Sequence, residues 1–175
     1  HHPLILADRM VQLDHMTRGR AMFGVGPGAL SSDAYMMGID PLTQRRRMDE
    51  SLGAILALMR GEIVNMETGW FMLNEARLQL APYSFPHMDV AVASTFSPSG
   101  PVTAGKHGVG MLSITASQPG GLTNAADSWD MLQEEATKAG KEVSRSAWRV
   151  LTSMHLADSR EEAIADVREG MTYFY

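Results

Sequence analysis

Apolar residues recur three and four positions apart in several stretches of the chain, which is the spacing of one face of an α-helix. The clearest stretch contains Met48, Leu52 and Ile55 and lies between Pro41 and Gly61. Proline is favoured in the first turn of a helix and glycine just after its end. The sequence therefore predicts a helix between these two residues. Weaker patterns of the same kind predict further helices at about 3–20, 100–107, 127–140 and from 159 onward.

Short continuous runs of apolar residues separate these helices, at 21–25, 90–93, 109–114 and 148–156. Such runs are typical of strands that are buried on both faces of a sheet. Residues 62–75 instead predict a β-hairpin that turns at Thr68 and Gly69. Strands that alternate with helices indicate parallel βαβ units. The sequence thus predicts an α/β fold with about four parallel core strands and one hairpin.

The composition is that of a folded globular chain, with 45% hydrophobic and 20% charged residues among 175. A net charge of −5 argues against broad contact with nucleic acid or anionic lipid. No apolar run approaches the ~18 residues that cross a bilayer, so we expect no membrane partner. The absence of cysteine excludes disulfides and a cysteine nucleophile. The histidines have no spacing typical of a metal site, and we expect none.

Three consecutive arginines, Arg45, Arg46 and Arg47, lie near the start of the helix that follows Pro41. A run of like charges on a helix usually forms a solvent-exposed face. We expect all three side chains to be exposed.

Ligands of parallel α/β folds bind at the carboxyl ends of the strands, so the loops that follow the predicted strands are candidate sites. One of them contains Ser94, Thr95 and Ser97 directly before a predicted helix start. The free N–H groups and positive end of a helix bind phosphate, and hydroxyl groups add donors. Ordinary helix capping by serine and threonine explains the same residues. Composition leaves phosphate binding and capping both open.

Gly26 and Gly28 flank Pro27 after the first predicted strand. Glycine lets a backbone approach a ligand closely, although a plain turn is the simpler interpretation of this segment. Residues 115–126 form a polar, glycine-containing segment, for which we predict a long loop. Loops of that length are uncommon unless they are functional or disordered.

Several short segments follow one another in an order that is more specific than any one of them. They are 13–20 (LDHMTRGR), 23–28 (FGVGPG), 38–41 (GIDP), 105–110 (GKHGVG) and 156–163 (LADSREEA). In this order they resemble the bacterial luciferase-like family of flavin-dependent monooxygenases, over nearly the whole chain. Residues 94–100 (STFSPSG) are most similar to its limonene monooxygenase-like branch.

The resemblance implies a (β/α)8 TIM-type barrel. Residues 1–175 would form a single domain, an incomplete interior portion of the barrel that lacks its first strands and its last strand. The resemblance assigns cofactor binding to Gly26, Gly28, Ser94, Thr95, Ser97 and Ser113. In it the Ser94–Thr95 loop and the following helix start hold the flavin phosphate, the glycine loop lies beside the flavin, and the strand end at Ser113 faces the isoalloxazine. Many relatives have an arginine that assists the phosphate where this chain has Pro27. No catalytic residue is implied.

The family's chemistry implies a flavin-dependent monooxygenase that uses reduced FMN (FMNH2) and O2 to oxygenate a small hydrophobic, terpene-like molecule. A flavin reductase is the implied partner, and a cytoplasmic homodimer is the implied state. Two alternatives stay open. One is a dehydrogenase or reductase of the same superfamily that uses the deazaflavin cofactor, and the other is a flavin-binding relative without turnover.

Overall fold

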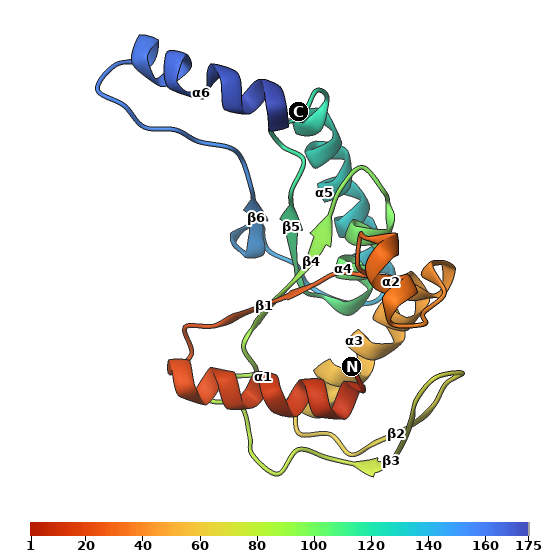
Figure 1. Cartoon of the computed structure of the whole chain (residues 1–175). Helices are drawn as coiled ribbons and strands as arrows, with labels where there is room; N and C mark the ends of the chain where they lie inside the picture. The colour runs from red at the N-terminus through yellow and green to blue at the C-terminus, as the bar shows by residue number, and fades with distance from the viewer. Residues whose placement is uncertain (175) are drawn as a thin grey trace.

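The computed structural model describes residues 1–174, in which helices and strands alternate along most of the chain (Figure 1). The elements in chain order are α1 (Pro3–Thr17), β1 (Met22–Val25), α2 (Ser31–Met36), the 3-10 helix η1 (Pro41–Thr43), α3 (Gln44–Met59), β2 (Val64–Glu67), β3 (Met72–Ala76), β4 (Asp89–Ser94), α4 (Ser99–His107), β5 (Gly110–Ser113), α5 (Gly121–Lys138), the 3-10 helix η2 (Arg145–Ala147), β6 (Trp148–Val150) and α6 (Arg160–Phe174).

Four strands form one parallel sheet in the order β1–β4–β5–β6. Its register pairs Val92 with Met111 and Ser94 with Ser113. Two parallel strands need a long crossover connection, usually a helix, that brings the chain back to the end of the sheet where the first strand began. Here α3, α4 and α5 lie in the three successive crossovers. The predicted α/β fold with four parallel core strands is confirmed.

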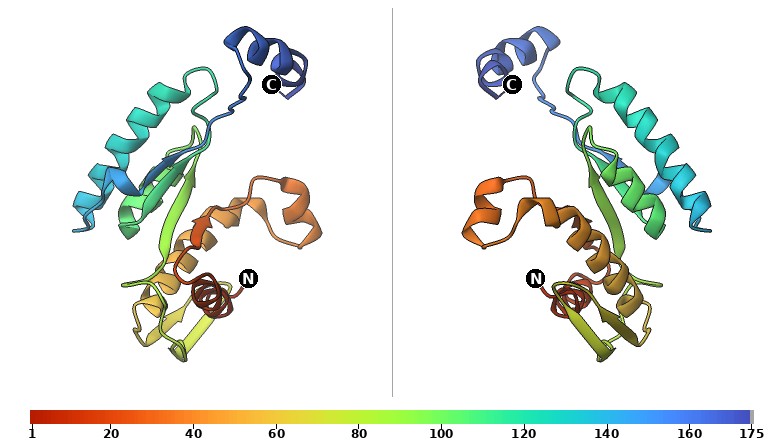
Figure 2. Two further views of the ribbon diagram at one scale, coloured as in Figure 1. Left: turned by 90° about the vertical axis from the view of Figure 1, so that its left-hand side faces the viewer. Right: turned by 90° about the vertical axis from the view of Figure 1, so that its right-hand side faces the viewer.

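The sheet has one covered face and one open face. Successive strand residues point to opposite faces, and Val92 and Met111 are buried in one core with Leu132 of α5. Figure 2 shows α4 and α5 lying along this side of the sheet. On the opposite face Met22 is 60% exposed and Ile114 is 37% exposed. The covered face therefore holds the apolar core, and the open face remains accessible within the described residues.

Strands β2 and β3 form the predicted hairpin as a separate antiparallel pair. The hydroxyl of Thr68 closes the turn by accepting hydrogen bonds from the N–H groups of Trp70 (3.3 Å) and Phe71 (3.0 Å). The Trp70 indole Nε1 then donates to Glu50 of α3 at 3.0 Å. The hairpin thus holds an aromatic side chain against the first half of α3.

Two segments at the strand ends differ from the prediction. Residues 31–36 form α2, a six-residue helix that we did not predict, because so short and exposed a helix shows no periodic apolar stripe. The predicted loop 115–126 is shorter, since α5 begins at Gly121 rather than near Asp127. A Cβ at Gly121 would lie 2.0 Å from the carbonyl oxygen of Thr115. Residues 121–126 therefore belong to α5, whose first turn has Gly121 buried and Leu122 and Thr123 exposed.

The last core strand is also shorter than its apolar composition predicts. Residues 148–156 have strand-like composition, but β6 covers only Trp148–Val150. Its neighbour β5 ends at Ser113, whose carbonyl accepts a last hydrogen bond from Leu151 N–H at 2.8 Å. Residues 152–156 have no strand partner among residues 1–174 and are exposed. The length of β6 is therefore set by the strand beside it.

Candidate cofactor site

The carboxyl ends of β1, β4 and β5 lie side by side and bring together most of the predicted site residues. Ser94 and Ser113 are register partners, and the N–H of Ile114 donates to the carbonyl of Ser94 at 3.0 Å. Gly26 follows β1 beside β4, since a Cβ at Gly26 would lie 3.6 Å from that of Ala93. This is the edge of a parallel sheet at which ligands of α/β folds bind.

The side chains of Ser94 and Ser113 are almost completely buried. The Oγ of Ser113 accepts a hydrogen bond from the Trp148 indole Nε1 at 3.0 Å, and Trp148 stacks on Trp129 of α5. The hydroxyl of Ser113 therefore points to the covered face, whereas the resemblance implied that this strand end faces the isoalloxazine. Ser94 Oγ donates to the carbonyl of Thr95 at 3.4 Å. Cofactor binding by these two serines stays a prediction.

Thr95 is exposed at the end of β4. Its carbonyl accepts a hydrogen bond from Asn124 Nδ2 of α5 at 3.1 Å, which ties the loop to the neighbouring helix. Ser97 Oγ lies 3.0 Å from Ser99 Oγ and accepts a hydrogen bond from the Ser99 N–H at 3.3 Å. One of the free backbone N–H groups at the start of α4 is therefore already bonded to Ser97. The loop combines an exposed hydroxyl with the positive end of a nine-residue helix. This arrangement fits a phosphate group.

Sequence reasoning missed Asn124, because we assigned it to an unstructured loop. Its position becomes clear only when α5 starts at Gly121 and carries residue 124 on its first turn. The available signal was an asparagine shortly before a predicted helix start, where its side chain can bond to backbone groups.

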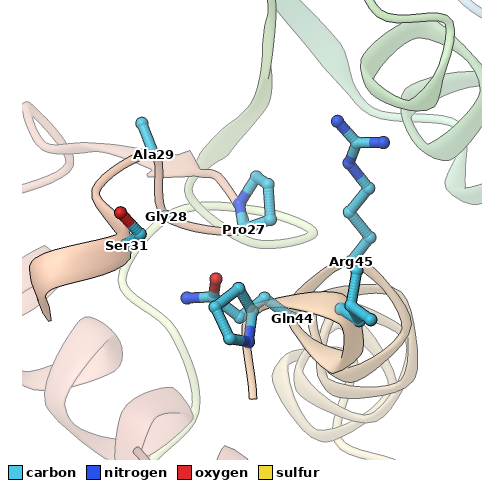
Figure 3. A pocket seen from close by; sticks show the side chains of 8 residues that line it. Pro27, Gly28, Ala29, Ser31, Gln44 and Arg45 are labelled. Carbon is cyan, nitrogen blue, oxygen red and sulfur yellow. The ribbon is translucent and has the colours of Figure 1, made fainter. Parts of the chain in front are cut away.

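A first cavity of about 360 Å³ is lined on one side by Pro27 and Gly28 and on the other by the start of α3. Figure 3 shows Gln44 and Arg45, which lie on α3, with the loop at Pro27 and Gly28. Gly28 has a φ of +88°, and a Cβ there would lie 3.0 Å from Gln44 Nε2. The glycine therefore allows both the left-handed backbone and the close approach to α3.

A second cavity of about 480 Å³ shares Pro27, Gly28 and Gln44 with the first and extends toward Arg47 and Trp70. The guanidinium carbon of Arg47 lies 5.5 Å from the centroid of the Trp70 ring. The prediction that all three arginines are solvent-exposed is wrong for Arg47, which is half-buried because the hairpin places Trp70 against it. The other two arginines are exposed as predicted.

Neither a group of three potential metal ligands nor a helix long and apolar enough to cross a bilayer occurs among residues 1–174.

Comparison with known proteins identifies relatives of the whole chain. Residues 1–175 match the model of the luciferase-like monooxygenases. Limonene 1,2-monooxygenase of Rhodococcus erythropolis is 46% identical over 173 residues, which cover 99% of this chain and 44% of that protein. This chain therefore spans about half the length of such relatives.

Two solved structures share the fold. The oxygenating constituent of 3,6-diketocamphane monooxygenase of Pseudomonas putida, in complex with FMN, matches with a TM-score of 0.79 and 24% identity, over 97% of this chain and 49% of that one. An F420-dependent secondary alcohol dehydrogenase, in complex with an F420–acetone adduct, matches with a TM-score of 0.76 and 20% identity, over 96% and 50%.

These matches confirm the predicted barrel-type α/β fold, present here in part, and the similarity to the limonene monooxygenase-like branch. The solved structures are less than 25% identical to this chain, and their similarity shows a shared fold. The family model covers every residue, and the Rhodococcus erythropolis relative is similar along almost all of them. On this basis the chain belongs to the luciferase-like monooxygenase family.

Proposed function

We propose that this chain is part of a flavin-dependent monooxygenase that uses reduced FMN and O2 to oxygenate a small hydrophobic, terpene-like molecule. The observation that carries the proposal is the 46% identity to a limonene 1,2-monooxygenase along 99% of the chain. The FMN complex of a structural neighbour supports the choice of flavin. The proposal includes a flavin reductase as partner, a homodimer, a cytoplasmic location and a single barrel domain.

The flavin phosphate would be held at the end of β4. The hydroxyl of Thr95 and the start of α4 would donate hydrogen bonds to it, with Asn124 holding the loop in place. The Gly26–Gly28 loop would lie beside the cofactor. Since Pro27 stands where many relatives have an arginine, hydroxyl groups and the helix would bind the phosphate without a cation from that position. When bound, reduced flavin would supply the oxygen-activating chemistry.

The chain's own contribution would be to bind and orient the reactants and to exclude water from them. An apolar wall on the cofactor's side favours a substrate that water does not solvate well. Residues on the open face, such as Ile114, would contribute to such a wall.

Binding of FMN to the full-length protein tests this proposal first. Calorimetric titrations with reduced FMN under anaerobic conditions would compare the parent with Thr95→Ala. Loss of one hydrogen bond to a charged group costs about 1.5–3 kcal/mol, so we expect a 10- to 100-fold weaker affinity, roughly tenfold per 1.4 kcal/mol. Thr137→Ala is the matched control, because this exposed threonine lies near the far end of α5. Equal affinity in all three proteins would contradict the phosphate site.

The structural similarity to an F420-dependent dehydrogenase supports one alternative, a deazaflavin-dependent dehydrogenase or reductase. The same loop would then hold the deazaflavin phosphate. Formation of an oxygenated limonene product from FMNH2, O2 and limonene, measured after chemical reduction of the flavin so that no reductase is required, distinguishes the two. A product that forms only with the protein supports the monooxygenase. Binding of the deazaflavin without FMN binding would favour the alternative, and FMN binding without any turnover would favour a non-catalytic relative.

A further inference from the structure

The second cavity combines an apolar wall with one half-buried cation. Leu30, Ile39, Met48 and Ile55 form much of the wall, and Arg47 is the arginine that lines it. A volume of about 480 Å³ lies in the range of sites that bury small organic molecules, which are mostly apolar with a few polar groups. The cavity therefore has the size and lining of a ligand site.

Arg47 has a hydrogen-bonding group that the described residues do not satisfy. Its Nε is buried and has no hydrogen-bond partner. Its guanidinium forms no ion pair within residues 1–174 and is held only against the Trp70 ring. Buried polar groups in native proteins are nearly always hydrogen-bonded, and each exception calls for an explanation such as a catalytic role or a bound ion. Because Arg47 lines the cavity, an anion there would supply the guanidinium with the partner that residues 1–174 do not.

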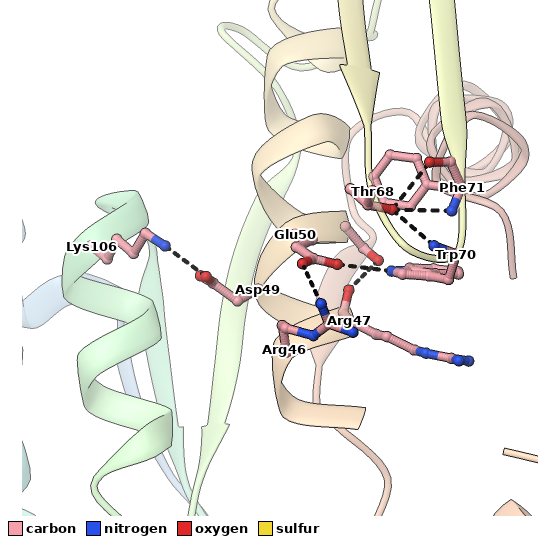
Figure 4. Close-up of polar contacts among 9 residues, drawn as sticks. Arg46, Arg47, Asp49, Glu50, Thr68, Trp70, Phe71 and Lys106 are labelled. Atoms are coloured by element: carbon pink, nitrogen blue, oxygen red, sulfur yellow. Dashed lines mark hydrogen bonds and ion pairs between the residues drawn. The ribbon is translucent and has the colours of Figure 1, made fainter. Parts of the chain in front are cut away.

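Nearby carboxylates are engaged elsewhere or lie at the surface. Glu50 accepts the Trp70 indole N–H at 3.0 Å and pairs with Arg46 at 3.7 Å, as Figure 4 shows. Asp40 accepts the N–H of Leu42 at 3.0 Å within η1. Asp33 lines the cavity from α2 but is exposed. None of them forms a salt bridge with Arg47.

The charge at the start of α3 also favours binding of an anion. The first turn of a helix favours negative charge because of the helix dipole, yet the first turn of α3 contains no acidic residue and includes the three arginines. An anion at this position would be stabilised both by the dipole and by the guanidinium.

We propose that the second cavity binds an amphipathic organic acid, with its carboxylate on Arg47 and its hydrocarbon part against the apolar wall. A guanidinium matches a carboxylate geometrically, with two parallel N–H donors. The cavity shares Pro27 and Gly28 with the first cavity. This proposal goes beyond the oxygenation reaction and does not depend on flavin binding.

The test is calorimetric titration of the full-length protein, without flavin, using octanoate and 1-octanol as probes of equal chain length. We expect the parent to bind octanoate more tightly. Arg47→Gln should weaken octanoate binding about 10- to 100-fold, the range for loss of a charged hydrogen bond, and should change 1-octanol binding less than about threefold. Arg45→Gln is the matched control, because Arg45 is an exposed arginine of the same helix that lines the first cavity only.

A second measurement uses tryptophan fluorescence and the conservative substitution Trp70→Phe. Octanoate should change the tryptophan fluorescence of the parent, and Trp70→Phe should abolish that change, because Trp129 and Trp148 stack together elsewhere. Equal affinity of the parent for octanoate and 1-octanol would overturn the proposal. So would equal loss of octanoate binding in Arg45→Gln and Arg47→Gln. If Arg47→Gln does not fold, the probe comparison and the Trp70 signal decide the question.

Discussion

Substitution of Gly100 by alanine tests how the candidate phosphate loop is held. Gly100 is the second residue of α4 and packs directly on the end of β4. A Cβ there would lie 2.7 Å from the carbonyl oxygen of Ala93 and 2.9 Å from the Cα of Ser94. Both are backbone atoms next to the paired end of β4, so neither can rotate away. An ordinary contact of 3.4 Å would require the helix start to move by roughly 0.7 Å in a close-packed interior.

Two opposing effects set the size of the change. Alanine is a better helix former than glycine by about 1 kcal/mol in a helix interior, and by less in a first turn. Overpacking costs about 1–3 kcal/mol, and contacts with rigid backbone belong to the upper part of that range. We therefore expect Gly100→Ala to lower the free energy of unfolding by about 1–2 kcal/mol. The outward shift of α4 should also weaken FMN binding, because it moves the helix start relative to Thr95.

Urea unfolding measures the stability effect through the midpoint concentration, provided that the slope is unchanged. Gly170→Ala on α6 is the control, since a Cβ at that position meets no atom within 4 Å. We expect no loss of stability in the control. The reasoning would be refuted if Gly100→Ala unfolded at the same urea concentration as the parent, or at a higher one.

Two further substitutions test interactions near the site. Ser113→Ala leaves the half-buried indole N–H of Trp148 without its acceptor and should destabilise the fold by about 1 kcal/mol in urea unfolding. An unchanged midpoint would contradict this, and FMN titration of the same variant tests the predicted cofactor role. Burial raises the pKa of Asp49, but hydrogen bonds from Lys106 and His107 outweigh it and hold the pKa below 3.8. Its contribution is then complete above pH 3.8 and is lost as the pH falls below that value, so urea midpoints of Asp49→Asn should depend less on pH in this acid range than those of the parent.

The main elements could be predicted because their signals are local. The spacing of Met48, Leu52 and Ile55 indicates α3, and all three side chains are buried in the core. The continuous apolar runs indicate β1, β4 and β5 within one or two residues. The length of β6 could not be predicted in this way, because it depends on where β5 ends and not on its own composition.

The candidate site is harder to predict, because its geometry comes from register. Alternation of apolar and polar residues shows which side of a strand faces the core, but it does so only in strands whose two faces differ in polarity. The runs that end at Ser94 and Ser113 are apolar on both faces, so nothing in them indicates that the Ser113 hydroxyl points to the covered face. That orientation depends on Trp148, which reaches Ser113 only after the chain has passed through α5.

The same dependence on distant segments explains the error at Arg47. A run of three arginines on a helix looks uniformly solvated, and the prediction holds for the two that remain exposed. Arg47 differs because the hairpin turn at Thr68 returns Trp70 to α3, where Glu50 accepts its indole N–H. The sequence pattern shows the charge of a side chain but does not show which distant segment packs over it. A half-buried cation that forms no ion pair among residues 1–174 is therefore visible only in the folded chain, and it is the observation on which the proposed acid site depends.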